Sequence, residues 1–184
     1  MHYKKLIGDR IYLSPITLED TNKYVEWMND RKITDNLNST YKLINEIGER
    51  EWLTKTMEKN EYTFGIVDKA TNELIGNCGI MDTNFILGKA TLGIFIGEES
   101  KRGIGIGKEV LRLLLDYGFN QLRLHNIDLA VFSFNKQAIA CYKKVGFKEY
   151  GRRHESYFLN GKWHDEILME ILEQDYQNTI LEKA

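Results

Sequence analysis

The chain has 184 residues, of which 42% are hydrophobic and 28% are charged, as in an average soluble globular protein. This composition excludes a wholly disordered, collagen-like or coiled-coil chain. A single domain over residues 1–184 is expected, because a chain of this length can bury roughly 70% of its unfolded surface. The formal net charge of -2 carries no general signal for nucleic acid or an anionic membrane, so neither is expected as a partner.

The two cysteines, Cys78 and Cys141, stand among apolar residues and outside any C-x-x-C or Cys/His cluster. Buried free thiols in a reducing compartment are therefore predicted, and no metal site is expected. The first ten residues include basic side chains but no apolar stretch of the kind found in signal peptides. No segment approaches the ~20 apolar residues of a membrane span. These features together predict a cytoplasmic protein.

In the first half of the chain the hydrophobic pattern changes from helical to extended. Thr17, with Asp20 three residues later, resembles a capping box and predicts that a helix begins there. Residues 45–59 are predicted to form a second helix, and residues 30–43 an irregular connection. Short apolar or alternating runs predict strands at residues 10–16, 62–67, 74–81 and 90–96, the last three as an antiparallel meander.

A strand, a glycine-rich loop, a helix and another strand then follow one another. The helix carries an apolar face made of Val110, Leu111, Leu114, Leu115, Phe119 and Leu122. The next strand is predicted at residues 127–134. Because a helical crossover joins strands that run in the same direction, this strand is predicted to be parallel to strand 90–96.

The last part of the chain has clear helix and hairpin signals. Asn135 and Gly146 fit the N-cap and the C′ residue of a helix over residues 136–145. Asn160-Gly161 is typical of a type I′ turn, which would join strands at residues 147–158 and 163–172. The sheet is therefore mixed, and the fold class is α/β or α+β.

The segment from Arg102 to Lys108 reads R-G-I-G-I-G-K and lies between a strand and the start of a helix. Free backbone N–H groups and the helix dipole make such a junction a natural phosphate site, and glycines let the backbone approach an anion closely. The spacing matches neither the P-loop pattern G-x-x-x-x-G-K-[ST] nor the dinucleotide pattern G-x-G-x-x-G. A glycine-rich turn without a ligand is the alternative.

Two segments carry a family resemblance. Arg102-x-x-Gly105-x-Gly107 matches the R/Q-x-x-G-x-G/A signature of the GNAT superfamily of N-acetyltransferases, and Asn135-x-x-Ala138-x-x-x-Tyr142-x-x-x-Gly146-Phe147 resembles its other hallmark segment. The block N-G-K-W-H-D at residues 160–165 resembles the RimJ/RimL-like branch, which includes ribosomal-protein N-terminal and bacterial spermidine acetyltransferases. The resemblance covers nearly the whole chain. It implies the GNAT fold: a mixed, mostly antiparallel sheet with a splayed parallel pair and helices on both faces.

The resemblance implies acetyl-CoA as co-substrate and no metal. The pyrophosphate would lie on the amides of residues 102–108, and the pantetheine along the end of strand 90–96. The implied cofactor-binding residues are Ile94, Phe95, Ile96, Arg102, Gly103, Ile104, Gly105, Ile106, Gly107, Lys108, Asn135 and Tyr142. Tyr142 would also protonate the leaving thiolate as general acid, and the N–H of Phe95 or Ile96 would polarise the thioester carbonyl. The alternative for Tyr142 is an ordinary core aromatic.

The sequence offers more than one candidate for the group that deprotonates the amine. Related sequences often carry a glutamate on the strand that corresponds to residues 90–96, and this chain has Thr91 there. The remaining candidates are Asp82, Glu98 and a water molecule held by backbone carbonyls. His125, at a helix-to-strand turn, is predicted to be a capping or surface residue.

The expected reaction is acetyl transfer to a primary amine by direct attack, because no Cys/His or Ser/His pair accompanies the cofactor segments. The acceptor is either a protein N-terminus or a small amine, such as a polyamine of the spermidine type or an amino sugar. An inactive CoA-binding regulatory module is the alternative of another class. Asp30, Asp35, Glu46 and Glu49 lie where the branch usually builds its acceptor site, or are solvated charges. A homodimer is compatible with these features.

Overall fold

The computed structural model describes residues 1–59 and 62–181. Its contacts divide the chain into two compact units. The first consists of Met1–Gly79 and Ile94–Ile106, and the second of Ile80–Gly93 and Gly107–Ala184. Strands β4 (Leu74–Asn84) and β5 (Lys89–Ile96) each contribute residues to both units. That residues 1–184 form a single domain stays a prediction.

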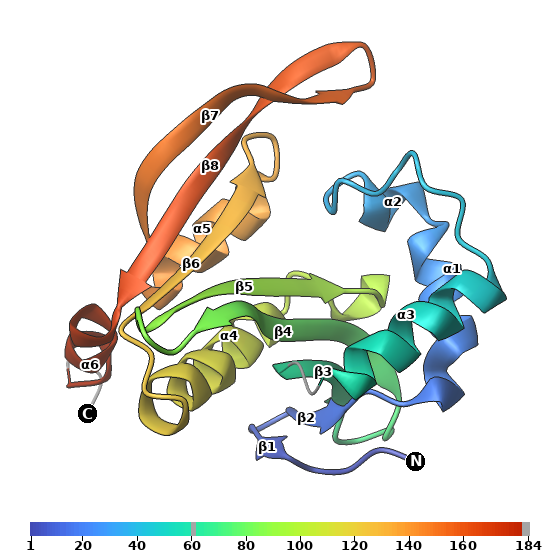
Figure 1. Ribbon diagram of the computed structural model, residues 1–184, viewed down its shortest axis with the longest axis horizontal. Coiled ribbons are helices and arrows are strands. Elements are labelled where there is room, and N and C mark those ends of the chain that lie inside the picture. The colour runs from blue at the N-terminus through green and yellow to red at the C-terminus, as the bar shows by residue number, and fades with distance from the viewer. Residues whose placement is uncertain (60–61, 182–184) are drawn as a thin grey trace. The chain divides into compact units, whose positions relative to one another are not determined.

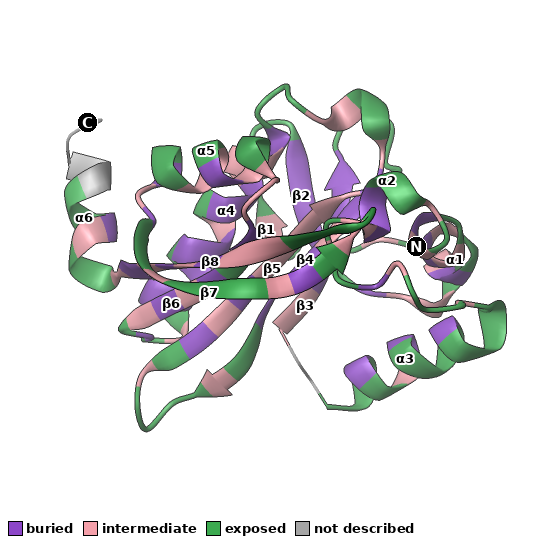
Figure 2. Cartoon of the chain, turned by 90° about the horizontal axis from the view of Figure 1, so that it is seen from above, coloured by how far each residue is buried: buried purple, intermediate pink, exposed green. Residues whose placement is uncertain are grey.

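The first unit combines antiparallel strands with three helices (Figure 1). Its strands follow the order β1-β2-β3-β4-β5, where β1 is Leu6–Ile7, β2 is Ile11–Pro15 and β3 is Tyr62–Asp68. Its helices are α1 (Thr21–Met28), α2 (Arg31–Thr34) and α3 (Glu46–Glu58), with short 3-10 turns at Leu18–Asp20 and Glu99–Lys101. Helix α1 packs against α3, and each helix turns one face inward (Figure 2).

Aromatic side chains fill the core of the first unit beside the end of β5. The Trp27 ring is only 3% exposed, and its centroid lies 5.7 Å from the centroids of both Tyr24 and Phe95. Gly97 follows β5 directly, and a Cβ atom added at Gly97 would overlap the Trp27 indole. Glycine at this position therefore lets the chain leave the strand close to an aromatic core.

The second unit contains the parallel strand pair and the long terminal hairpin (Figure 1). Its strands follow the order β4-β5-β6-β8-β7, where β6 is Asn126–Phe132, β7 is Lys148–Leu159 and β8 is Lys162–Leu172. Helix α4 runs over Ile106–Asp116 and ends in a π-turn at Tyr117–Gln121, and α5 (Lys136–Val145) and α6 (Glu173–Leu181) follow. Apolar residues buried on α4 include Val110, Leu111, Leu114 and Leu115.

Most of the predicted elements are confirmed to within a few residues. Strands β5 and β6 pair in parallel, as the crossover predicts, and the sheet is mixed. Asn160 and Gly161 have positive φ values of 51° and 80°, as a type I′ turn requires. Asn135 caps α5 by accepting a hydrogen bond from the N–H of Ala138, and Gly146 ends this helix at φ 120°.

Several features differ from the sequence prediction. Thr17 caps only a 3-10 turn by accepting from the N–H of Glu19, and the Asp20 carboxylate contacts His2 instead of completing a capping box. Residues 30–43 contain the short helix α2, and the strand β1 and the helix α6 have no counterpart in the prediction. Cys78 is buried as predicted, but Cys141 is only half-buried.

No helix in the described part of the chain is long and apolar enough to cross a membrane.

Candidate active site

The glycine-rich loop presents a row of backbone N–H groups without acceptors. Gly103 and Gly105 have φ values of 73° and 91°, which glycine adopts without strain. Among the described residues, no acceptor takes the N–H groups of Gly103, Ile104 or Gly105. Helix α4 begins at Ile106, so the first N–H groups of the helix also lack intrahelical acceptors. The segment can therefore bind an anion through its backbone.

Two arginine side chains hold this loop in place. Arg102 donates from Nε to the carbonyl of Ile96 at 2.9 Å and from Nη2 to the carbonyl of Gly97 at 2.7 Å, which ties the loop to the end of β5. Arg10 donates to the carbonyl of Ile104 at 2.7 Å. Its guanidinium also lies where a side chain at Gly105 would point. Arg102 therefore positions the loop, and the sequence reasoning missed Arg10 as a second positive charge beside it.

The packing around Gly107 tests whether the loop suits a diphosphate. A Cβ atom at Gly107 would meet nothing closer than the Cys141 sulfur at 3.9 Å. Its φ value is not among the positive ones, and it lies in the first turn of α4. Neither packing nor backbone conformation therefore requires glycine here, although glycine weakens a helix. A ligand that must approach the backbone gives a reason for it, so these residues fit the pyrophosphate of acetyl-CoA.

Helix α5 carries the predicted acid, Tyr142, in the second unit. Burial raises the pKa of the Tyr142 phenol to about 12, with a smaller contribution from Cys141. The ring packs edge-on against Phe147 at 5.9 Å between centroids. Within the described chain, the hydroxyl forms no hydrogen bond. A phenol that stays protonated and has no internal acceptor is able to donate its proton to a leaving thiolate.

The other predicted binding residues occupy distinct places. Asn135 uses its side-chain oxygen as the cap of α5, at 3.1 Å from the N–H of Ala138, so its amide NH₂ group is what remains for a ligand. Lys108 lies in the first turn of α4. The residues Ile94, Phe95 and Ile96 form the end of β5, and all three are partly exposed.

Both cysteine side chains favour the protonated thiol, which is the unreactive form. Burial raises the pKa of the Cys141 thiol, and Lys108 and Lys144 offset this only in part. Burial also raises the pKa of the Cys78 thiol. Since the thiolate is the nucleophilic form, neither residue suits an acyl-enzyme mechanism, and direct attack by the amine is the simpler chemistry.

The structure weakens the base candidates that the sequence offers. Glu98 forms an ion pair with Lys23 at 2.5 Å, so its carboxylate already has a partner. Asp82 is exposed on β4 and has a φ value of 49°. His125 is exposed too, as predicted for a surface residue.

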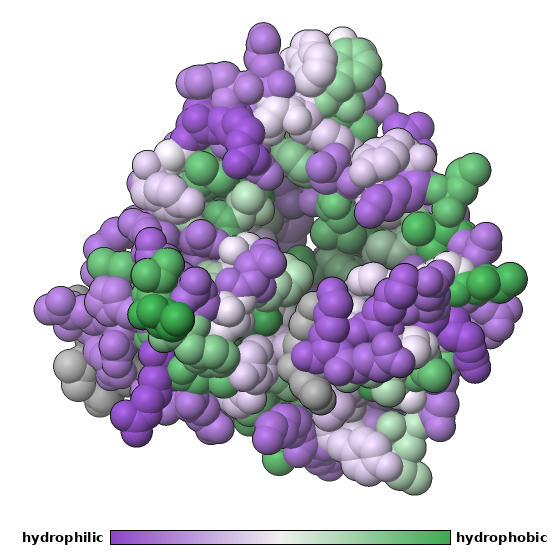
Figure 3. Space-filling model, viewed as in Figure 1, coloured by the Kyte–Doolittle hydropathy of each residue, from purple (hydrophilic) through white to green (hydrophobic). Residues whose placement is uncertain are grey.

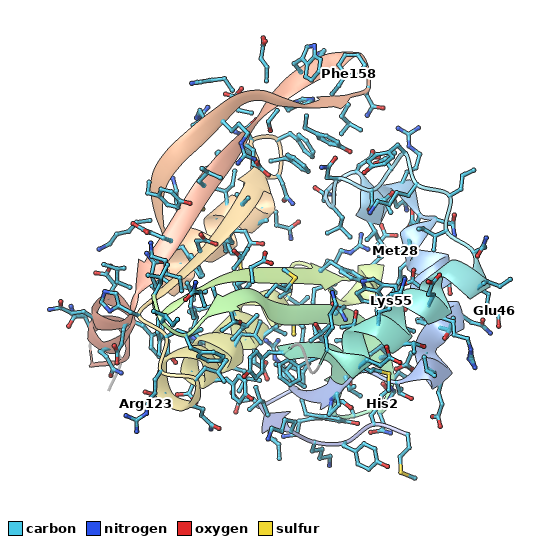
Figure 4. The ribbon with its side chains drawn as sticks, viewed as in Figure 1. His2, Met28, Glu46, Lys55, Arg123 and Phe158 are labelled. Carbon is cyan, nitrogen blue, oxygen red and sulfur yellow. The ribbon has the colours of Figure 1, made fainter. Side chains whose placement is uncertain are left out.

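One of the four acidic residues in the expected acceptor region differs from the others. Asp30 caps α2, and Asp35 pairs with Arg31 and accepts a hydrogen bond from Thr40. Glu46 lies exposed in the first turn of α3 (Figure 4). Glu49 is only 6% exposed, and burial raises its pKa. In the described chain, the Glu49 carboxylate forms neither a hydrogen bond nor an ion pair.

Residues 1–59 and 62–181 contain no group of three or more His, Cys, Asp or Glu side chains arranged to hold a metal ion.

Comparison with known proteins shows the family of this chain. Residues 10–148 match the acetyltransferase (GNAT) domain family. A spermidine N(1)-acetyltransferase from Vibrio cholerae is 34% identical over 128 residues, which cover 70% of this chain and 73% of that protein. The probable N-acetyltransferase YjcK from Bacillus subtilis is 32% identical over 133 residues, with the same coverage.

A solved structure shares the fold over most of the chain. The spermidine N-acetyltransferase from Vibrio cholerae, in complex with CoA and spermine, superposes with a TM-score of 0.83. It is 28% identical, and the match covers 92% of this chain and 99% of that one. A spermidine N-acetyltransferase from the same organism has also been solved as a dodecamer. This chain belongs to the GNAT family and is an acetyl-CoA-dependent N-acetyltransferase.

Proposed function

We propose that the acetyl acceptor is an aliphatic polyamine of the spermidine type. The observation that carries this proposal is Glu49 on α3, which is only 6% exposed and whose carboxylate forms no hydrogen bond or ion pair among the described residues, although the charge of Lys42 acts on it. A buried carboxylate is costly unless a cation neutralises it. A primary or secondary alkylammonium group supplies such a positive charge and can donate hydrogen bonds to the carboxylate.

The rings near Glu49 support the same ligand class. Tyr24 and Trp52 lie 5.9 Å apart between ring centroids, and Glu49 acts electrostatically on the Tyr24 phenol. Aromatic faces attract alkylammonium groups. A polyamine presents several such groups on an apolar chain, whereas a protein N-terminus presents a single ammonium followed by amides. The relatives that acetylate spermidine add support at the level of the family.

The acceptor assay uses CoA thiol release with spermidine, a simple monoamine and N-terminal peptides. In the Glu49→Gln variant, we expect the KM for spermidine to rise about 10-fold or more, because a charged hydrogen bond is worth about 1.5–3 kcal/mol. The matched control is Glu46→Gln, which changes an exposed carboxylate in the same helix and should leave KM unaltered.

Other outcomes of this assay would replace the proposal. Peptides that turn over faster than any small amine would favour protein N-terminal acetylation, and an equal KM for Glu49→Gln and wild type would remove Glu49 from the acceptor site. Absence of amine-dependent thiol release would favour the CoA-binding module without turnover.

We also propose that the chain self-associates. Phe85, Ile86 and Leu87 form the exposed turn between β4 and β5, and Ile86 is 96% exposed. Polar side chains cover most of the face shown in Figure 3, interrupted by separate hydrophobic groups. An exposed apolar turn is typical of a contact surface. A relative that forms a dodecamer supports a second copy of this chain as the molecule that binds there. Light scattering should give a molar mass above that of one chain.

A further inference from the structure

Thr91 and Asp128 form a side-chain pair where the parallel strands of the second unit stop pairing. The β5–β6 register runs through three residue pairs and ends at Thr91↔Asp128. Strand β6 continues to Phe132, paired there with β8. The Thr91 hydroxyl donates a hydrogen bond of 2.7 Å to Oδ1 of Asp128. These two residues are 37 positions apart in the chain, and only the parallel pairing brings them together.

The Asp128 carboxylate has capacity left for a second partner. Asp128 is half-buried, and among the described residues no cation pairs with it and no donor other than Thr91 reaches it. Two acids of β8 lie on the same sheet face. Glu170, opposite Asp128, accepts a hydrogen bond from Asn126 at 2.7 Å, and Glu166, opposite Phe132, pairs with Arg153. Asp128 is therefore the carboxylate of this face that remains open to an amine.

We propose that Asp128 is the proton acceptor for the amine substrate, with Thr91 as its hydrogen-bonded relay. This inference rests on acetyl transfer to an amine and holds for any amine acceptor. The ammonium nitrogen gives a proton to the Thr91 oxygen while the Thr91 hydroxyl proton passes to Asp128, which leaves a neutral amine and a carboxylic acid. The amine lone pair then forms the C–N bond and the C–S bond breaks.

Tyr142 and solvent account for the other proton transfers of the reaction. The leaving thiolate takes the Tyr142 proton, and the new amide nitrogen loses its second proton, which restores the phenol. Asp128 returns its proton to solvent. The sum is acetyl transfer with release of one thiol and a single proton, and no oxidant or metal enters the reaction.

Charged and titratable groups around Asp128 influence how the rate depends on pH. On the neighbouring strands these are Thr91 and Lys89 of β5, Glu170 of β8, and Lys148, Tyr150 and Arg153 of β7. Lys148 pairs with Asp175, and Arg153 pairs with Glu166. Burial mainly raises the pKa of the Tyr150 phenol, and the charges of Asp128 and Glu170 raise it further. Among the described residues of this cluster, Asp128 is thus the carboxylate without a partner beyond Thr91.

The decisive test compares Asp128→Asn with wild type across pH, with spermidine as the amine. At pH 7 we expect kcat/KM to fall about 10²-fold, the lower end for general base catalysis. The Asp128→Asn variant can acetylate only the fraction of the amine that is already neutral. Its rate should therefore rise about tenfold per pH unit as the pH approaches the amine pKa of about 10. The difference from wild type should therefore shrink at high pH, while the CoA dissociation constant stays the same.

Three controls separate this role from a structural one. Glu170→Gln changes the carboxylate opposite Asp128 and should keep the wild-type rate within about twofold. Thr91→Ser should keep the relay, and Thr91→Val should lose most of it. Melting temperatures check folding for each variant.

The outcomes are distinguishable. An active wild type with an equally active Asp128→Asn variant would overturn the proton-acceptor role alone. A loss that is constant with pH, or one shared by Glu170→Gln, would assign Asp128 a structural role and overturn the proposal as well. A wild-type chain without amine-dependent thiol release would overturn both this role and the proposed function.

Discussion

Replacing Tyr142 with Phe is expected to lower kcat about 10²-fold while the CoA dissociation constant stays nearly unchanged. The phenyl ring keeps its packing against Phe147, and the substitution removes only the proton donor. General acid catalysis is worth about 10²–10⁴-fold, and the lower end is expected because a water molecule can replace the donor in part. The measurement is steady-state thiol release, with CoA affinity from calorimetry and folding from the melting temperature.

The pH dependence gives a second readout on the same residue. Because burial raises the pKa of Tyr142 to about 12, the phenol is still protonated at pH 10, where an ordinary tyrosine would be half ionised. Wild-type kcat should therefore not fall between pH 9 and about pH 11 through loss of this acid. A Phe variant that turns over at the wild-type rate when chemistry is limiting would make Tyr142 a packing residue.

Replacing Gly105 with Val is expected to weaken CoA binding by tenfold or more. Gly105 has a φ value of 91°, a conformation that a β-branched residue does not adopt without strain, and its Cβ would lie 3.3 Å from the Arg10 guanidinium. The loop would then change shape, and its N–H groups would no longer converge on a phosphate. Calorimetry on the folded variant measures the effect.

Gly107→Ala separates ligand binding from folding at the same loop. The added methyl group has room in the protein, and alanine in place of glycine stabilises a helix by up to about 1 kcal/mol. We therefore expect equal or higher stability in urea together with weaker CoA binding. Unchanged CoA affinity in both glycine variants would show that the loop does not hold the pyrophosphate.

Local sequence signals predicted the parts of this fold that depend on local chemistry. The Asn160-Gly161 turn was predictable because its positive φ values require such residues. The Asn135 cap was predictable because the first N–H groups of a helix need an acceptor. The parallel direction of β6 was predictable because a helical crossover joins parallel strands. The capping box at Thr17 was wrong because Asp20 meets His2, from a segment 18 residues earlier in the chain.

The parts of the site that depend on tertiary contacts were not predictable in the same way. The Arg102 guanidinium was expected to add charge for a phosphate, but the fold directs it to the carbonyls of Ile96, the last residue of β5, and Gly97, which follows it. Glu49 looks like a solvated helix charge until α3 packs on α1. The Thr91–Asp128 pair exists only because two strands far apart in sequence align in register. The roles of Tyr142 and the loop residues stay predictions.

The central claim is that acetyl passes directly from acetyl-CoA to an amine on this chain. A rapid-quench single turnover with acetyl-CoA and spermidine, followed by mass spectrometry of the protein and the amine together with thiol titration, tests it most directly. We predict that free thiol and acetylated amine appear at the same rate and in equal amounts, while the mass of the protein stays constant. Acetyl carried on Cys78, Cys141 or any other residue before the amine is modified, or thiol release without acetylated amine, would contradict it.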